Sequence, residues 1–196
     1  MTGLPWRLHR GWLAAGDARH WQALLEQRVL WEQPQVLVYG KRYRTPRLAA
    51  FLAERGVSYR YSSVVHQGQG WPDWFEPLLA KVNDHCQARF NGCLLHRYRD
   101  GQDRMGWHAD DEPEIDPSQP IASLSLGATR SFLLRQRQGP ERHSVDLVDG
   151  DLLVMEPPCQ QEWLHALPVR QRVRTSRMNL TFRVFQSTAA FSRESG

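Results

Sequence analysis

The chain has 196 residues, a hydrophobic content of 41%, a charged content of 23% and a net charge of +4. These values exclude a disordered or collagen-like protein, and no apolar run approaches the roughly 18 residues of a membrane span. The N-terminus lacks the apolar stretch of a signal peptide, and the three cysteines are widely spaced, so we expect a cytoplasmic protein without membrane contact.

The N-terminal part is predicted to hold two helices with short strands between them. Helical spacing of apolar residues indicates one helix over residues 17–29, with Asp17 as its cap, and another over 72–86, opened by a proline. The stretch 45–56 carries the start and stop signals of a helix but equally fits a lid loop. Short strands are expected at 35–39 and 59–62.

After residue 90 the pattern changes to short strands separated by turn residues at fairly even spacing. Such a pattern is typical of a sandwich, a barrel or a jelly roll. We therefore predict a mainly β fold with flanking helices (α+β). The expected strands are 93–98, 121–126, 131–136, 144–148, 151–155, 162–167 and 177–185.

The charges are unevenly distributed along the chain. Residues 41–60 contain six cations and one anion, whereas residues 101–117 contain six anions and one cation. A basic stretch followed by an acidic one suggests a surface for a polyanion beside a site for a cation. A solvated charged face explains the same pattern equally well.

The first candidate site is the run His108-Ala109-Asp110, followed 55 residues later by His165. In a strand, residues i and i+2 point to the same side, so His108 and Asp110 can bind one ion together. Two histidines and a carboxylate form the facial triad of non-haem Fe(II) oxygenases, and the same ligands also bind catalytic Zn(II). Taken alone, the short pattern often arises by chance.

The second candidate is the segment RMNLTFR at 177–183, in which polar and apolar residues alternate. Period 2 places its polar residues in one row on one face of a strand. On a surface strand this row would simply be solvated. Inside a barrel, its two guanidinium groups would need anions, and a small dicarboxylate would satisfy them. Combined with the triad, the row indicates an iron enzyme that uses 2-oxoglutarate.

Several motifs occur in one order along the chain: MGWHADDEP, PIASLSLGATRSF, GDLLVMEPP, then His165 and RMNLTFR. Together they resemble the AlkB family of Fe(II)/2-oxoglutarate-dependent nucleic-acid dealkylases. The resemblance covers roughly residues 90–185 and, more loosely, 35–80.

The resemblance implies a double-stranded β-helix, or jelly roll, that carries iron and 2-oxoglutarate inside. Residues 91–186 would form this catalytic core. Residues 1–90 would form an N-terminal extension with helices and a nucleotide-recognition lid packed on the core. Residues 187–196 would be a polar tail, and the whole chain one structural domain.

The resemblance also implies roles for individual residues. His108, Asp110 and His165 match the Fe(II) ligands, and Arg177 matches the arginine that pairs with the distal carboxylate of 2-oxoglutarate, helped by Tyr98. His96 stands where family members carry Asn near the co-substrate, although a histidine bonded within the strand wall is the alternative. The remaining co-substrate positions are Asn179, Thr181 and Arg183.

On the substrate side, Tyr61 matches an aromatic residue that stacks a flipped base against His108, with Tyr59 nearby. Stacking suits any alkylated base, and a cationic base gains further from π and carboxylate neighbours. Asp111 and Glu112 are candidates to contact the base edge. Both could instead lie in a solvated acidic turn.

The segment around Tyr39 resembles a hairpin tip that pushes an aromatic residue into the gap left by a flipped base. Tyr39 is therefore a candidate wedge, and Arg42, Arg44 and Arg47 are candidate phosphate contacts. A packed tyrosine and surface arginines are the alternative.

The implied function is oxidative demethylation of bases such as 1-methyladenine and 3-methylcytosine in DNA repair. The reaction would use Fe(II), 2-oxoglutarate and O2 and release formaldehyde, succinate and CO2. The expected partner is alkylated DNA, single- or double-stranded, bound by a monomer. The alternatives are the same chemistry on RNA, protein or a small molecule, a nucleic-acid-binding protein with a vestigial metal site, and a zinc hydrolase.

Overall fold

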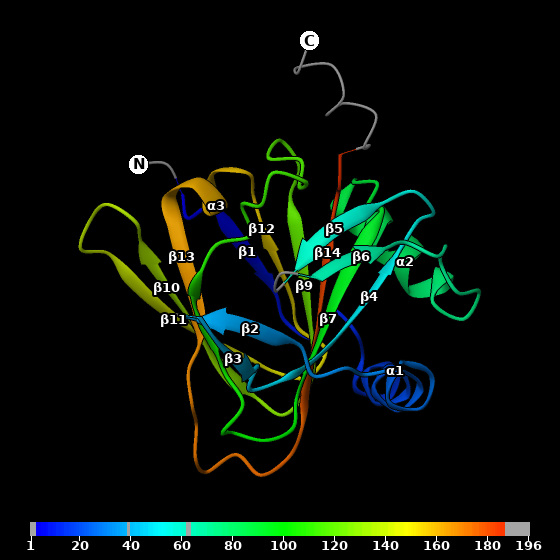
Figure 1. Ribbon diagram of the computed structural model, residues 1–196, viewed down its shortest axis with the longest axis horizontal. Helices are drawn as coiled ribbons and strands as arrows, with labels where there is room; N and C mark the ends of the chain where they lie inside the picture. The colour runs from blue at the N-terminus through cyan, green and yellow to red at the C-terminus, as the bar shows by residue number, and fades with distance from the viewer. Residues whose placement is uncertain (1–2, 39, 62–63, 187–196) are drawn as a thin grey trace.

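The computed structural model describes residues 3–38, 40–61 and 64–186. Its body consists of two antiparallel sheets, with two short hairpins beside them (Figure 1). The six-stranded sheet has the order β1 (Trp6–His9), β12 (Leu152–Met155), β9 (Ile121–Gly127), β14 (Arg177–Arg183), β7 (Gly92–Tyr98) and β4 (Leu48–Ala53). The four-stranded sheet has the order β11 (Arg142–Leu147), β10 (Arg130–Gln136), β13 (Trp163–Leu167) and β8 (Met105–His108).

Strand β14 lies in the middle of the larger sheet and is buried along its whole length. It pairs with β7 on one side and β9 on the other. Its apolar residues Met178, Leu180 and Phe182 are fully buried in the main hydrophobic cluster. Because side chains alternate along a strand, its polar row must face the opposite way, towards the interior between the two sheets.

Two helices cover the outer face of the larger sheet, α1 (Ala15–Arg28) and α2 (Glu76–Cys86) (Figure 1). Leu25 of α1 and Val82 of α2 are fully buried in the same cluster as β14. Both helices were predicted, but their starts differ. Asp17 lies in the first turn and makes no side-chain cap, and α2 begins only after a turn at 73–75.

A short third helix, α3 (Pro158–Glu162), precedes β13. Among the helices of the described residues, none combines the length and apolar composition that a membrane span requires.

The stretch 45–56 forms neither a helix nor a loop, because its middle is strand β4 at the edge of the larger sheet. Its sequence, LAAFLA, contains good helix formers. Pairing with β7 from Leu48 opposite Arg97 to Ala53 opposite Gly92 nevertheless holds it extended. Ala49 and Ala53 are buried there against Leu94 and its neighbours. Packing in the sheet overrides the local preference for helix.

Both edge strands of the larger sheet come from the part of the chain before residue 90. Strand β1 pairs with β12, and β4 pairs with β7. The sheet is therefore completed by the N-terminal segment, and the division of the chain near residue 90 stays a prediction.

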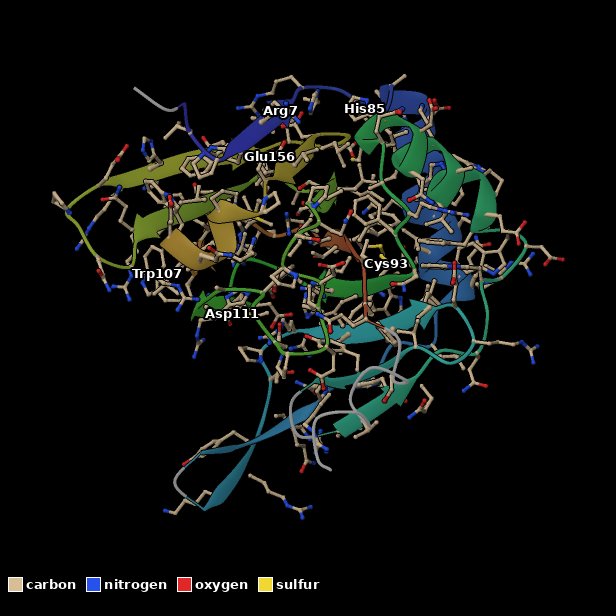
Figure 2. The ribbon with its side chains drawn as sticks, turned by 90° about the horizontal axis from the view of Figure 1, so that it is seen from above. Arg7, His85, Cys93, Trp107, Asp111 and Glu156 are labelled. Atoms are coloured by element: carbon tan, nitrogen blue, oxygen red, sulfur yellow. The ribbon has the colours of Figure 1, made fainter. Side chains whose placement is uncertain are left out.

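The two hairpins are β2 (Gln35–Val38) with β3 (Lys41–Arg44), and β5 (Ser58–Tyr61) with β6 (Val64–Gln67). Seen from above, the β2–β3 hairpin projects away from the two large sheets (Figure 2). All four residues of β3 are exposed. This hairpin thus offers its cations to solvent.

Candidate active site

The two candidate histidines lie opposite each other on neighbouring strands of the smaller sheet. His108 ends β8 and pairs in register with His165 of β13, and their ring centroids are 4.2 Å apart. Asp110 completes the group, since one ligand atom from each of the three residues lies within 4.8 Å of the others. The structure thus brings together all three predicted metal ligands.

Asp110 is positioned by a contact that the sequence analysis did not predict. Strand β8 ends at His108, so the alternation of side chains along a strand does not extend to Asp110. Instead, the backbone N–H of Asp110 donates to Oε1 of Gln160 in α3 at 2.9 Å. Asp110 Oδ1 then lies 3.9 Å from Nε2 of His108. Nothing in the sequence marks Gln160, because only the tertiary fold brings α3 to this loop.

The protonation of the three groups suits a divalent cation. Nδ1 of His108 donates to the carbonyl of Gly106 at 2.8 Å, which leaves the lone pair on Nε2. Burial, followed by the nearby His108, lowers the pKa of His165 to about 3. Burial alone would raise the pKa of the Asp110 carboxyl, but Arg183 and the two histidines hold it below its ordinary value. Two imidazoles and one carboxylate form a donor set that binds divalent cations.

The polar row of β14 lines the same cavity as the three ligands. Arg177 Nη2 donates to Ser125 Oγ at 2.8 Å and to Asn179 Oδ1 at 2.6 Å. Asn179 Oδ1 also accepts from Ser123 at 3.0 Å, and Asn179 Nδ2 donates to Thr181 at 2.8 Å. Sequence reasoning missed the two serines, although they are polar residues at i and i+2 in the otherwise apolar strand β9.

Arg177 is a buried cation without a carboxylate partner among the described residues. Arg177 is only 2% exposed, and its Nε has no hydrogen-bond partner among the described residues. Burial lowers the pKa of Arg177 to about 10, which still leaves it charged at neutral pH. Its Cζ lies 5.6 Å from the centroid of the Tyr98 ring, and Tyr98 is its partner in the β7–β14 register. A buried guanidinium of this kind favours an anionic ligand.

Arg183 occupies the other end of the row, beside the metal ligands. Its Nη2 forms an ion pair with Asp110 Oδ1 at 2.7 Å. Burial opposes its charge, but Asp110, Tyr59 and Glu112 together raise the pKa of Arg183 above its ordinary value. Within the described residues its Nε and Nη1 have no hydrogen-bond partner. Arg183 therefore orients Asp110 and keeps donors for another group.

His96 of β7 also lines the cavity and lies opposite Asn179 in the sheet register. It is 4% exposed. Burial, followed by the charges of Arg47 and Arg183, holds the pKa of His96 well below its ordinary value. His96 is therefore a neutral polar group in the cavity wall.

Tyr59 does not offer a free ring face for stacking. It is 1% exposed and packs against Phe51 and Phe185. Its hydroxyl donates to Oε1 of Glu112 at 2.8 Å. Burial and the neighbouring Asp110 raise the pKa of Glu112, whose Oε2 has no partner within the described residues. In place of the expected base contact, Tyr59 holds Glu112 at the edge of the site.

Two other substrate-side residues lie in different surroundings from each other. The Asp111 side chain is 54% exposed and forms an ion pair with Arg137. Arg47, expected to contact phosphates, is only 8% exposed, and its Nη1 donates to the carbonyl of Arg104 at 3.2 Å. Arg47 directly precedes β4 and lies near enough to His96 for its charge to lower the pKa of that histidine. Its contact with phosphates stays a prediction.

The two remaining predicted contacts cannot be placed. Tyr39 and the side chain of Tyr61 lie outside the described residues. The neighbouring cations Lys41, Arg42 and Arg44 are exposed on β3.

The side chains present fit a metal ion with a bound dicarboxylate. The facial set of two imidazoles and one carboxylate leaves open positions on a bound ion. The same cavity contains Arg177, whose guanidinium has no carboxylate partner in the described structure, and the unpartnered nitrogens of Arg183. A keto acid could therefore contact the metal with one end and Arg177 with the other.

Comparison with known protein families and sequences supports this assignment. The model of the 2OG-Fe(II) oxygenase superfamily matches residues 6–183. A mouse protein named DNA oxidative demethylase ALKBH2 is 38% identical over 157 residues, which are 76% of this chain and 66% of that protein. A mouse protein named alpha-ketoglutarate-dependent dioxygenase alkB homolog 3 is 35% identical over 167 residues, 79% of this chain and 57% of that one. The chain therefore spans less than two thirds of the length of these relatives.

Solved structures show the same fold. The structure of OsALKBH1 superposes with a TM-score of 0.68 at 20% identity, covering 93% of this chain and 99% of that one. A 2OG-Fe(II) oxygenase family oxidoreductase from Burkholderia pseudomallei gives a TM-score of 0.60 at 16% identity, covering 91% and 84%. The jelly-roll fold predicted from the sequence is confirmed, as is the resemblance to the AlkB family.

Proposed function

The chain belongs to the 2OG-Fe(II) oxygenase superfamily, and on this premise we propose that it oxidatively removes N-methyl groups from bases in alkylated DNA. One observation carries the proposal. The three metal-ligand residues and Arg177, a buried cation with no carboxylate partner in the described structure, line a single cavity. The names of the relatives support DNA as the substrate.

In the mechanism, the chain's residues bind, orient and shield the reactants. When bound, Fe(II) with 2-oxoglutarate supplies the activation of O2 that oxidises a C–H bond, with release of succinate and CO2. His108, Asp110 and His165 would hold the metal and leave positions open to the co-substrates. Arg177, assisted by Tyr98, would hold the distal carboxylate. The methyl carbon of the base would leave as formaldehyde.

Glu112 is the best-placed residue for contact with the base. Tyr59 fixes one oxygen of its carboxyl group, and the other is unpartnered in the described structure. The raised pKa of Glu112 favours a carboxyl group that shares a proton with a polar base edge. The stacking role of Tyr61 and the contact of Asp111 remain proposals from the family resemblance.

The finer statements about partners and location are also proposals. The exposed cations of β3 support binding to a phosphate backbone, which does not distinguish single from double strands. Three free thiols support a reducing, cytoplasmic environment. We further propose a monomer in which residues 91–186 carry the chemistry and residues 1–90 the nucleotide-recognition lid.

The test is a demethylation assay with Fe(II), 2-oxoglutarate and O2. Oligonucleotides with one 1-methyladenine or 3-methylcytosine would be compared as single-stranded DNA, duplex DNA and RNA, with formaldehyde and succinate measured together. We expect equal amounts of both products on at least one DNA form. Activity on RNA alone would favour the same chemistry on another nucleic acid. Binding without succinate release would favour a nucleic-acid-binding protein, and hydrolysis without 2-oxoglutarate a zinc hydrolase.

A further inference from the structure

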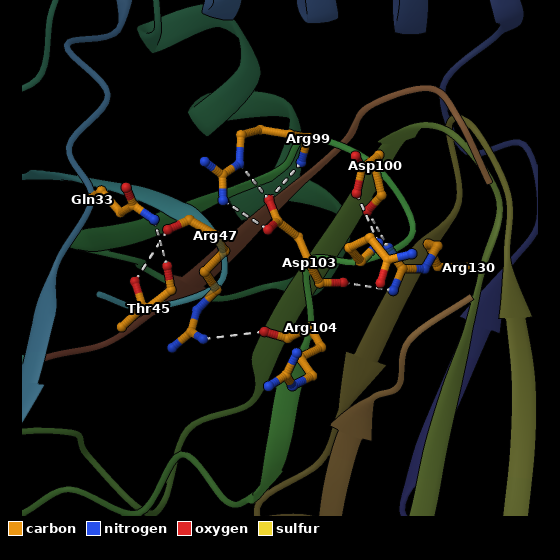
Figure 3. A network of polar contacts seen from close by, with 9 residues as sticks. Gln33, Thr45, Arg47, Arg99, Asp100, Asp103, Arg104 and Arg130 are labelled. Atoms are coloured by element: carbon orange, nitrogen blue, oxygen red, sulfur yellow. Dashed lines mark hydrogen bonds and ion pairs between the residues drawn. The ribbon is translucent and has the colours of Figure 1, made fainter. Parts of the chain in front are cut away.

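Another buried arginine lies outside the predicted site. Arg130 is the first residue of β10 and is 1% exposed. It donates to the carbonyls of Asp100 at 3.0 Å, Asp103 at 2.8 Å and Pro168 at 2.6 Å. Figure 3 shows Arg130 beside Asp100 and Asp103, which belong to the loop between β7 and β8. Arg130 therefore ties together the loops that close this end of the barrel.

These contacts use both terminal nitrogens of Arg130, but its Nε has no hydrogen-bond partner and its charge no ion pair with a carboxylate in the described structure. Its three acceptors are neutral carbonyl oxygens. The carboxylate of Asp103 instead accepts two bonds of 2.8 Å from the Arg99 side chain (Figure 3). Asp103 and Asp100 attract the charge of Arg130 without forming an ion pair with it, so this buried cation contributes a positive potential to its surroundings.

Arg130 and Arg177 lie near the same ring, that of Tyr98, at the co-substrate end of the cavity. The Cζ of Arg130 lies 5.8 Å from the centroid of the Tyr98 ring, and the Cζ of Arg177 lies 5.6 Å from it. The charge of Arg130 is one of the causes that lower the pKa of Arg177. The two cations thus repel each other across a short distance, and a carboxylate bound at Arg177 would relieve that repulsion.

We propose that Arg130 is a positioning and specificity residue that favours keto acids with a second, distal carboxylate over those without one. The inference rests on the proposed co-substrate site at Arg177. Arg177 would contact the distal carboxylate directly, whereas Arg130 would act through its charge and through its contact with Tyr98. A keto acid without a distal carboxylate would place no negative charge at this end.

The test compares two keto acids that present the same metal-binding end. 2-Oxoglutarate has a distal carboxylate, and 2-oxobutyrate does not. Dissociation constants would be measured by calorimetry, without O2, on protein loaded with Mn(II). Arg130→Met removes the charge, and Arg130→Lys keeps the charge but loses the forked hydrogen bonds. Arg99→Gln is the matched control, because it alters the same network at a side chain that is 47% exposed.

We expect Arg130→Met to weaken 2-oxoglutarate binding about tenfold, as for a unit charge acting over about 12 Å at an effective dielectric constant of about 20. Its affinity for 2-oxobutyrate should stay within about twofold of the wild type. Arg130→Lys and Arg99→Gln should keep the wild-type preference for 2-oxoglutarate. Thermal melts would check folding, and Arg130→Gln, which retains amide donors, replaces the methionine variant if that variant does not fold.

Equal weakening of both keto acids in the uncharged variant would overturn the inference and leave Arg130 with a structural role. Loss of the preference in Arg130→Lys as well would also overturn it, since charge would not be the cause. Failure of the proposed co-substrate site has a different signature. The wild-type protein would then bind both keto acids equally or bind neither.

Discussion

The closed end of the cavity and its mouth are built in different ways. At the closed end, Tyr98, Arg177 and their serine partners lie on β7, β9 and β14, and strand register sets their positions. At the mouth, Glu112 and Asp111 lie on a loop beside the hairpins, and side-chain contacts hold them. Changes at the closed end should therefore affect every substrate alike, whereas changes at the mouth should affect some substrates more than others.

The largest expected effect is at the metal ligands, where the two regions meet. His108→Ala or Asp110→Ala should reduce demethylation to background, because each removes one of three protein ligands from an open site. Even the loss of an outer partner of a ligand typically costs about 10–100-fold. Product formation on every oligonucleotide would be measured, with circular dichroism as the control for folding. Near-wild-type turnover by either variant would refute the triad.

Arg177→Ala tests the closed end alone. Losing one partner of a buried charged pair costs about 3–5 kcal/mol. The affinity for 2-oxoglutarate should therefore fall roughly 150- to 4,000-fold, at about 1.4 kcal/mol per decade. Calorimetry would measure it, and kcat/KM should fall equally on single- and double-stranded DNA. An unchanged affinity would show that the distal carboxylate binds elsewhere.

Tyr39→Ala tests the predicted wedge. A wedge replaces the stacking that a flipped base leaves behind in a duplex, whereas a single strand has no such gap. Base–aromatic stacking contributes about 1–3 kcal/mol, so kcat/KM on a methylated duplex should fall about five- to 150-fold. Activity on the same lesion in a single strand should change little.

Two results would contradict the wedge at Tyr39. Equal losses on both strand forms would make the tyrosine a general packing residue. No loss on either would leave it without a role in substrate binding. Tyr43→Ala is a useful control, because Tyr43 is 51% exposed on the same hairpin.

The smallest expected effect is a difference in acid sensitivity. Burial alone would raise the pKa of Asp103, but its bonds with Arg99 hold it below the ordinary value of 3.8. Its ionised form is thus favoured in the folded state, so its stabilisation is present above about pH 4 and is lost as pH falls below that. Asp103→Asn should lower the urea midpoint of unfolding at pH 7. The urea midpoint of this variant should also decline less steeply between about pH 5 and 3, the range around the ordinary pKa of Asp.

At Glu112, near the mouth, ionisation has the opposite effect on the stability of the fold. Its pKa is raised in the folded state, so ionisation above its ordinary pKa disfavours folding. Glu112→Gln should therefore leave the urea midpoint at pH 7 unchanged or higher. A lower urea midpoint at pH 7 in Glu112→Gln would show that the two regions do not differ in this way. So would a decline of the urea midpoint below pH 5 in Asp103→Asn that equals that of the wild type.

The sequence by itself determined most of the strands after residue 90, the three metal ligands and the polar row of β14. These features depend on period-2 alternation and on residue chemistry, which are local and can be recognised from the chain. Strands β13 and β14, which carry His165 and the polar row, each pair with a strand on both sides, whereas β8 with His108 is an edge strand.

Only the tertiary structure decided the rest. Strand β4 consists of helix-forming residues held extended by β7, and Arg47, directly before that strand, is buried. Gln160 and Arg130 act through contacts with loops that are distant in sequence. Local sequence patterns do not specify which distant segments come into contact, because those contacts form, and contribute free energy, only when the sheets pack.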